Sequence, residues 1–156
     1  MDNCGLLRVL VKAKGVVEMS VSGQSMSPFL LPGDKVSVVP CIKLRAGDLV
    51  VLPGNRSGEP VLHRVTSISS GEVAVVGDNA CAASTVPVSQ LIGQVTKMRL
   101  EGDEGWCALP HMLLAEDIAR LSCHIATGGD DVLQLKLKRR ELCAFLRAEL
   151  MGQGRS

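Results

Sequence analysis

The 156-residue chain is long enough for one domain with a buried core, without help from disulfides or a structural metal. Its formal net charge of +1 argues against a protein that binds nucleic acid or an anionic membrane through its overall field. Two Phe, one Trp and no Tyr leave few rings on which single-stranded nucleic acid could stack. We therefore expect a single domain over residues 1–156, with an aliphatic core and no nucleic-acid partner.

The six cysteines are spread along the chain without Cys-x-x-Cys spacing, and no secretory signal is recognisable. These features favour reduced thiols in a cytoplasmic protein. Cys107 with His111, and Cys123 beside His124, fit no common zinc-binding spacing. Buried or half-buried side chains are the preferred interpretation of these residues, and we expect no metal and no other cofactor.

The first predicted element is a short amphipathic helix over residues 6–11, followed by Gly15 as its end. Four apolar residues share one face of this helix: Leu6, Leu7, Leu10 and Val11. The apolar stretch is much shorter than the ~20 residues that cross a bilayer, so we expect no transmembrane segment. A strand over residues 16–21 then leads to a turn at Ser25.

The middle of the chain reads mostly as short strands separated by turn residues. The predicted strands span residues 36–39, 49–52, 61–68, 73–76 and 92–100. Short β-rich runs at this spacing are typical of antiparallel, barrel-like sheets rather than of alternating β-α-β units.

Two helices are predicted after residue 100, over residues 109–125 and 132–151, with Asp130 as the candidate N-cap of the second. The second helix carries five basic residues, which are Lys136, Lys138, Arg139, Arg140 and Arg147. A basic amphipathic helix can make peripheral contact with a membrane or bind a partner. The preferred interpretation is a terminal helix that packs on the domain and exposes its charged face to solvent.

The stretch that carries candidate chemistry is residues 22–39, where Ser25 stands two residues after a glycine, on a predicted turn before a strand. His63 lies within a strand-like run, and Asp78 stands where another strand stops. These are the three residue types that a nucleophile, a general base and an orienting carboxylate require. With an unperturbed pKa near 6.5, an imidazole can accept the serine proton at neutral pH.

Four motifs, in order along the chain, resemble the motif series of type I signal peptidases. They are Gly23-x-Ser25-Met26-x-Pro28-x-Leu30-x-x-Gly33-Asp34-x-Val36, Gly47-Asp48-x-Val50, His63-Arg64-Val65 and Gly77-Asp78-Asn79. Each motif alone is weak, but the ordered series is specific, and it covers about half of the chain. The same clan of serine peptidases includes the LexA-like self-cleaving repressors.

The resemblance implies a mainly β fold, that is, a β-rich α+β protein with a signal peptidase/LexA-like barrel-type catalytic core. The peptidase core would span residues 20–100, with a short helix before it and a helical extension over residues 106–151. His63 stands where most bacterial members and LexA-like proteins carry a lysine, as in the archaeal and endoplasmic-reticulum type of signal peptidase.

The resemblance also implies roles for individual residues. Ser25 would be the acylating nucleophile and, through its backbone N–H, an oxyanion donor. His63 would be the base and then the acid, and Asp78 would hold the tautomer of His63. Four residues of the turn are expected to bind the substrate: Gly23, Gln24, Met26 and Pro28. Asp34 is expected to be a turn residue rather than a catalytic one.

Three departures from the family pattern narrow the expected function. Gly23 stands where many members carry a serine that assists the oxyanion, and Ser84 lies where members with a histidine base often have a further aspartate. No membrane anchor is recognisable, although family enzymes are usually tethered at the bilayer. We therefore expect a soluble serine endopeptidase with a narrow peptide or precursor-protein substrate, such as the leader of a ribosomally made modified peptide.

Two other functions are compatible with the fold that the motifs imply. A LexA-like self-cleaving regulator would normally use lysine and carry a DNA-binding helix-turn-helix, for which the roughly twenty residues before Ser25 leave no room. A peptide-binding module that has lost turnover is the second alternative, and the departures at Gly23 and Ser84 would suit it.

Overall fold

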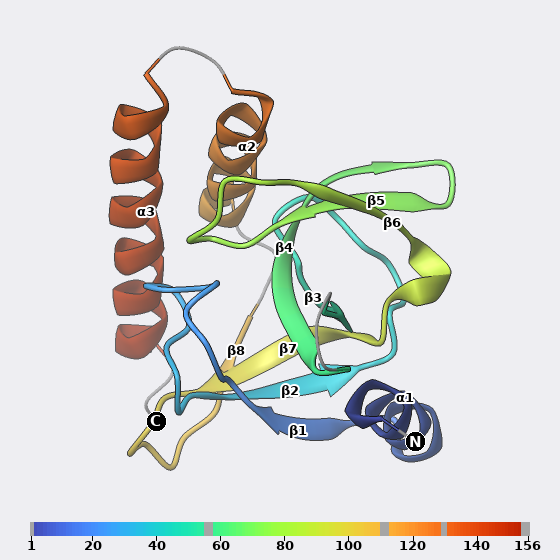
Figure 1. Cartoon of the computed structure of the whole chain (residues 1–156). Helices are drawn as coiled ribbons and strands as arrows, with labels where there is room; N and C mark the ends of the chain where they lie inside the picture. The colour runs from blue at the N-terminus through green and yellow to red at the C-terminus, as the bar shows by residue number, and fades with distance from the viewer. Residues whose placement is uncertain (1, 55–57, 110–112, 129–130, 154–156) are drawn as a thin grey trace.

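The computed structural model describes residues 2–54, 58–109, 113–128 and 131–153, which form a curled antiparallel β-sheet with helices on two sides (Figure 1). This β-rich α+β architecture is the one that the sequence predicts. Along the described residues the elements are α1 (Asn3–Lys14), β1 (Val17–Ser20), β2 (Lys35–Val39), β3 (Leu49–Pro53), β4 (Pro60–Ser69), β5 (Glu72–Val76), β6 (Ser84–Pro87), a 3-10 turn (Val88–Gln90), β7 (Gly93–Arg99), β8 (Cys107–Ala108), α2 (Leu113–Thr127) and α3 (Val132–Gln153).

The strands follow the order β1-β2-β7-β3-β4-β5-β6, and β8 pairs with β7 outside this path. All of these pairings are antiparallel. The register shifts between Ser37 and Val38 of β2, and between Val65 and Ser67 of β4. Such bulges bend a strand and increase its twist, which helps the sheet to curl into the half-barrel of Figure 1.

The strand β3 is buried on both of its faces, from Leu49 to Leu52. Successive side chains of a strand point to opposite faces. Leu49 and Val51 join a core that includes residues of all three helices, whereas Val50 and Leu52 join a second core with β4 and β5. The uninterrupted apolar run of this strand is explained by these two cores.

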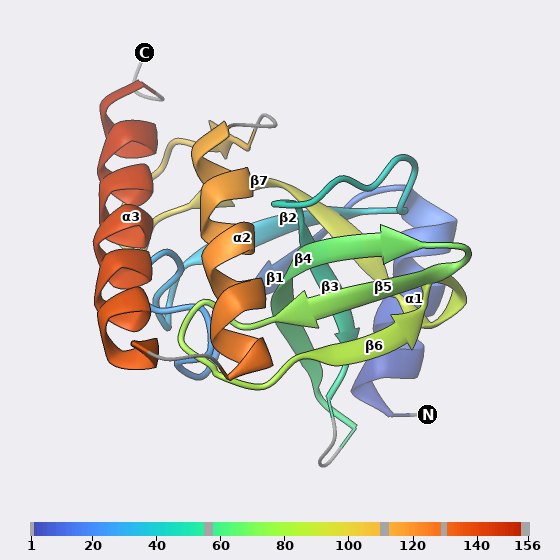
Figure 2. The same cartoon turned by 90° about the horizontal axis from the view of Figure 1, so that it is seen from above.

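The helices lie on two sides of the sheet, with α2 and α3 packed together on one side and α1 on the other (Figure 2). The helix α1 begins earlier than predicted, because the carboxylate of Asp2 accepts a hydrogen bond from the N–H of Gly5. It ends at Gly15 as predicted, with a left-handed φ of 77°. None of the described helices has both the length and the apolar composition that crossing a membrane requires.

The predicted strands are confirmed with small changes at their ends, but two short strands, β6 and β8, were not predicted. The strand β6 is mostly exposed and contains Ser, Thr and Pro, so it lacks the apolar alternation that would reveal it. The strand β8 has two residues. The candidate cap Asp130 lies outside the described residues.

The helix α3 is tied to the turn before β2 by an ion pair. Nη1 of Arg147 lies 2.6 Å from Oδ2 of Asp34, and this carboxylate also accepts hydrogen bonds from the backbone N–H groups of Leu31 and Glu101. Burial raises the pKa of Asp34, but these hydrogen bonds, with that from Arg147 the strongest, outweigh burial and hold the pKa below its usual value. Asp34 is thus a turn residue, as expected, and also an anchor for α3.

Replacing Asp34 with Asn should destabilise the protein by about 3 kcal/mol at pH 7, because the partly buried Arg147 loses its buried partner. The control is Asp117→Asn in the exposed pair with Arg120, which should cost less than about 1 kcal/mol. Folding lowers the pKa of Asp34. The stability that its carboxylate contributes is therefore fully present above pH ~4 and is lost as the pH falls through the pKa of Asp34 in the folded protein. Urea unfolding at several pH values should therefore show the gap between wild type and Asp34→Asn closing in acid; equal costs for the two variants would contradict the anchor.

Candidate active site

The Ser25 turn lies between β1 and β2 and is held by the loop that follows β5. The carbonyl oxygen of Ser25 accepts a hydrogen bond of 2.8 Å from the N–H of Asn79. The side-chain amide of Asn79 donates to the carbonyl oxygen of Gln24 over 3.2 Å. Gly23, with a φ of 77°, provides the left-handed conformation that the turn requires. Asn79 therefore fixes the position of the candidate nucleophile.

The loop after β5 adjoins both Ser25 and His63. Arg64 pairs with Val76, the last residue of β5, and the charge of Asp78, two residues farther along, acts on His63. A Cβ placed on Gly77 would lie 2.8 Å from the carbonyl oxygen and 3.4 Å from the Cβ of Ser25. Ser25 thus packs closely against Gly77, in the same loop as the Asp78 whose charge acts on His63.

Arg64, the next residue of β4, forms a buried ion pair with Asp78 in the loop after β5. Nε and Nη2 of Arg64 donate to the two carboxylate oxygens of Asp78 over 2.8 and 2.7 Å. Their side chains are 2% and 0% exposed. Nη1 of Arg64 donates to the carbonyl oxygen of Gly47, and the guanidinium lies 5.1 Å from the centre of the Phe29 ring. The pair therefore joins β4, the loop after β5 and two turns.

This arrangement leaves His63 without the carboxylate contact that the resemblance implies. Both oxygens of Asp78 are engaged by Arg64, and no hydrogen bond joins Asp78 to His63 among the described residues. The buried Nδ1 of His63 has no partner there. Burial lowers the pKa of His63, and the negative charge of Asp78 partly opposes this effect. Asp78 consequently acts on His63 through its charge, and the prediction that it holds the tautomer is not supported by a hydrogen bond.

Ser25 is half-buried, and two of its groups are available for chemistry. Neither its hydroxyl nor its backbone N–H makes a hydrogen bond to a described residue. The N–H can therefore donate to an oxyanion that forms above the turn. The hydroxyl makes no hydrogen bond to His63 in this structure. Such catalytic hydrogen bonds are often formed only when substrate is bound.

A groove runs from Ser25 along the edge of the sheet. Its lining includes Gly23, Ser25, Met26, the β1 residue Met19 and the first residues of β4. A neighbouring pocket continues the groove between β1 and α1. The strand β1 is the first in the order of the sheet, and among the described strands it pairs with β2 alone, so its other edge can pair with an extended chain.

The four residues predicted to bind substrate are divided between two pockets, with Gly23 and Met26 in the groove and Gln24 and Pro28 outside it. Gln24 and Pro28 line a separate pocket beside α3, together with Asp78. Met26 lines the groove but is 2% exposed, and its Sδ accepts a hydrogen bond from the N–H of Asp78 over 3.4 Å. Ser84 begins β6 and pairs with Val75.

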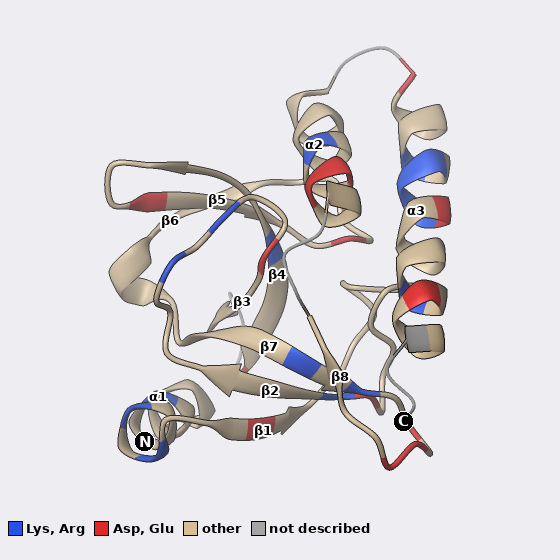
Figure 3. Ribbon diagram, turned by 180° about the vertical axis from the view of Figure 1, so that it is seen from behind, with Lys and Arg blue, Asp and Glu red and all other residues tan. Residues whose placement is uncertain are grey.

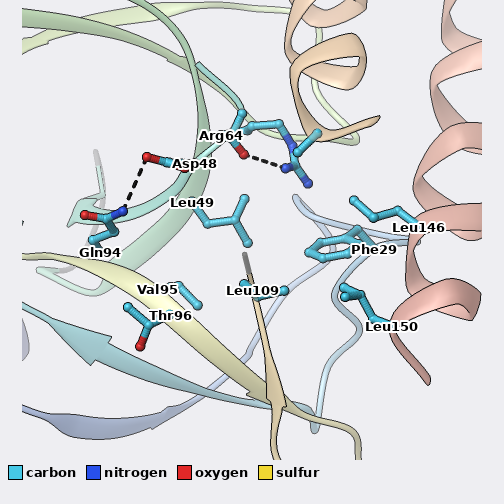
Figure 4. Close-up of a pocket in the computed structure, with 12 residues that line it drawn as sticks. Phe29, Asp48, Leu49, Arg64, Gln94, Val95, Thr96, Leu109, Leu146 and Leu150 are labelled. Carbon is cyan, nitrogen blue, oxygen red and sulfur yellow. Dashed lines mark hydrogen bonds between the residues drawn. The ribbon is translucent and has the colours of Figure 1, made fainter. Parts of the chain in front are cut away.

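A cavity of about 60 Å³ lies between the sheet and the C-terminal helices, and Figure 4 shows the side chains that line it. Phe29, Leu146 and Leu150 line it together with Arg64, whose guanidinium donates to Gly47 across one end (Figure 4). None of the three predicted catalytic residues lines this cavity. It is a gap in the core behind the ion pair, and the candidate site lies at the groove beside Ser25.

The described residues contain no cluster of three or more His, Cys, Asp or Glu side chains that could hold a metal ion. Cys107 is buried, and its thiol donates to the carbonyl oxygen of Leu150. Cys123 and His124 are exposed on α2, and His111 lies outside the described residues. All six cysteines are free thiols.

Sequence reasoning selected Ser25 and His63 as candidates, but it missed the partner of Asp78 and the contacts that Gly77 and Asn79 make with the Ser25 turn. A signal was present, because an arginine inside an apolar strand needs a buried carboxylate as partner. Alternation along β4 also puts Arg64 and His63 on opposite faces, so one carboxylate could not face both side chains equally.

Comparisons of the chain with protein-family models, with curated proteins and with solved structures found no match in any of the three. The resemblance to type I signal peptidases therefore rests on the four ordered motifs alone.

Replacing Gly77 with Ala should displace the Ser25 turn, because the added Cβ would collide with the carbonyl oxygen of Ser25. We expect a loss of about 1–3 kcal/mol in the free energy of unfolding. The N–H of Asn79, which donates to Ser25, should exchange faster with solvent. The control is Gly105→Ala, since no atom lies within 4 Å of a Cβ at that position. Unchanged exchange at Asn79 in Gly77→Ala would contradict the close packing.

Proposed function

We propose that this chain is a serine endopeptidase that resembles type I signal peptidases and uses Ser25 and His63. The observation that carries this proposal is the close packing of Ser25 against Gly77, next to the Asp78 whose charge acts on His63. It comes with a serine hydroxyl that makes no hydrogen bond to the described residues. A glycine at position 77 leaves the space that this arrangement needs.

In the proposed acylation step, Oγ of Ser25 attacks the carbonyl carbon of the peptide while His63 accepts the hydroxyl proton. The N–H of Ser25 donates to the resulting oxyanion, an interaction that typically contributes a few kcal/mol to transition-state stability. His63 then gives the proton to the leaving amine, and the C–N bond breaks. Water hydrolyses the ester by the same steps in reverse order, with His63 again as base.

The substrate we propose is an extended segment of a peptide or precursor protein, such as a leader. The open edge of β1 would pair with its backbone, and the groove from Ser25 toward α1 would accept alternate side chains. The six free thiols suit a reducing compartment, and we propose that the protein acts in the cytoplasm.

Asp78 is a positioning residue in this proposal. Its backbone and side chain hold the loop that carries Gly77 and Asn79, and its carboxylate neutralises Arg64. Its charge also raises the pKa of His63 against the effect of burial. Catalysis would thus depend on Asp78 through the shape of the site and its field.

A peptide-binding module without turnover is the second candidate, and one observation favours it. Nδ1 of His63 is buried without a partner among the described residues, so nothing there orients the imidazole as a triad carboxylate does. The groove beside β1 would bind a peptide in either case.

Labelling with a fluorophosphonate probe, followed by intact mass, separates the two candidates. We expect one adduct on the wild type and none on Ser25→Ala, because the phosphorus bonds to Oγ of Ser25. His63→Ala should label at least about 100-fold more slowly, which is the usual contribution of a general base. The matched control is Ser27→Ala, which removes the other serine of the same turn and should label like the wild type. A folded wild type that takes no label, or labels elsewhere, would favour the binding module.

The rate of labelling should rise with pH through a midpoint below 6.5, the unperturbed pKa of histidine. The physical reason is burial, which lowers the pKa of His63 and so keeps the imidazole neutral at a lower pH. The measurement is the rate constant of adduct formation between pH 4.5 and 8 in wild type. A midpoint above 7, or a profile that His63→Ala leaves unchanged, would contradict the assignment of His63 as base.

A further inference from the structure

A second pocket adjoins the Ser25 turn on the side of α3, and we call it the α3 pocket. Its volume is about 340 Å³, a size at which proteins bind small ligands and side chains. It is lined by Gln24, Ser27 and Pro28 of the turn, by Asp78 and Asn79, and by Lys136, Leu137, Arg139 and Arg140 of α3. Figures 1 and 2 show these loops beside α3.

The α3 pocket carries an excess of positive charge. Among the described residues that line it, Lys136, Arg139 and Arg140 are basic and Asp78 is acidic. The carboxylate of Asp78 accepts hydrogen bonds from Nε and Nη2 of the buried Arg64. Figure 3 shows most of the basic residues of α3 in the half of the helix that lies near its connection to α2. A negatively charged group in the pocket would therefore be attracted by all three cations.

Arg139 is the residue that points to a ligand. It is 3% exposed, and it donates from Nη1 to Oγ of Ser122 and from Nη2 to the carbonyl oxygen of Ala80. Its buried Nε has no partner among the described residues. A buried donor without an acceptor costs stability, and an oxygen ligand in the pocket would supply the acceptor. Burial also lowers the pKa of Arg139, as expected of a cation whose charge is incompletely compensated.

We propose that the α3 pocket binds a carboxylate of the peptide, so that the substrate carries an Asp or Glu close to the bond that Ser25 attacks. The assignment of this ligand as substrate rests on the proposed peptidase function. Gln24 lines the α3 pocket, while its neighbours Gly23 and Ser25 line the groove, so one extended peptide can reach both sites. Nε of Arg139 would donate to the carboxylate, and Lys136 and Arg140 would add charge from the exposed side.

A peptide carboxylate suits this pocket better than a lipid headgroup does. The unpartnered donor belongs to a buried side chain, which a group at the end of a flexible side chain can reach and a flat bilayer surface cannot. Exposed basic residues of α3 such as Lys138, which does not line the pocket, would contribute to membrane binding as much as Lys136. This difference supplies the control for the experiment.

The test is the binding of two fluorescent ten-residue alanine-based peptides to the Ser25→Ala protein, which cannot turn them over. One peptide carries two Glu residues at its centre, and the other carries Gln at the same positions. We expect the Glu peptide to bind at least about tenfold more tightly in 50 mM salt, because charge-assisted hydrogen bonds are of this strength. This preference should fall below about threefold when Lys136→Gln and Arg140→Gln are added, and it should persist when Lys138→Gln is added instead.

Two-dimensional NMR of the arginine Nε–H groups gives a second readout. The resonance of Arg139 should shift with the Glu peptide and stay in place with the Gln peptide. Equal affinity for the two peptides, or an equal loss of preference in Lys138→Gln, would overturn the proposal. Tight binding to phosphatidylserine vesicles that Lys138→Gln weakens as much as Lys136→Gln would instead identify a membrane surface and overturn it as well.

The result of the peptide-binding test does not depend on whether Ser25 reacts with a fluorophosphonate. A preference for Glu in a protein whose wild type takes no fluorophosphonate would keep the carboxylate pocket and reject the peptidase. If the wild type is labelled on Ser25 but the Ser25→Ala protein binds the Glu and Gln peptides equally, the peptidase proposal stands and the carboxylate-binding proposal is wrong.

Discussion

The ion pair of Arg64 and Asp78 connects the segments that meet beneath the candidate site. It joins β4 to the loop after β5, and Arg64 reaches the turn before β3 through the carbonyl oxygen of Gly47. The Ser25 turn packs on the pair through Met26 and Phe29. Both charges are almost fully buried, so removing either would leave the other uncompensated, at a typical cost of about 3–5 kcal/mol. The position of the candidate nucleophile thus depends on this one interaction.

Alternation along β4 separates structure from chemistry, because adjacent residues of a strand point to opposite faces. Arg64 pairs with Asp78 in the loop after β5, while its neighbour His63 belongs to the other face of β4. Gly77, the residue before Asp78, leaves the space against which Ser25 packs. A carboxylate on the Arg64 face influences His63 by its field alone.

The turn that carries Ser25 lies between two pockets of different character. The groove beside β1 is bounded by a strand edge and apolar side chains and suits an extended backbone. The α3 pocket is basic and contains a buried guanidinium with an unused donor. The helix α3 is anchored to the domain by Arg147 and Asp34, close to the same turn, so the basic residues have a fixed position relative to Ser25.

Local patterns in the sequence were enough to predict most of the fold. The apolar alternation of β2, β4 and β5 and the turn residues between them defined the strands, and Gly15 defined the end of α1. The short strands β6 and β8 carry too few apolar residues for such a pattern. Ser25 and His63 could be selected from motif order, but the partner of Asp78 depends on strand register, which is a long-range property. The buried partners of Arg139 and Arg147 depend on how α3 docks, and no local pattern specifies that.

The most direct test of this account is a crystal structure of the protein after reaction with a small fluorophosphonate. The account predicts phosphorus bonded to Oγ of Ser25 and an imidazole nitrogen of His63 within ~3.2 Å of the adduct. We also expect Asp78 to keep its hydrogen bonds from Nε and Nη2 of Arg64. An adduct on Ser25 with His63 turned away and another side chain in hydrogen-bond contact would contradict the assignment of His63. A structure in which Asp78 leaves Arg64 and binds His63 would contradict the division of the two faces.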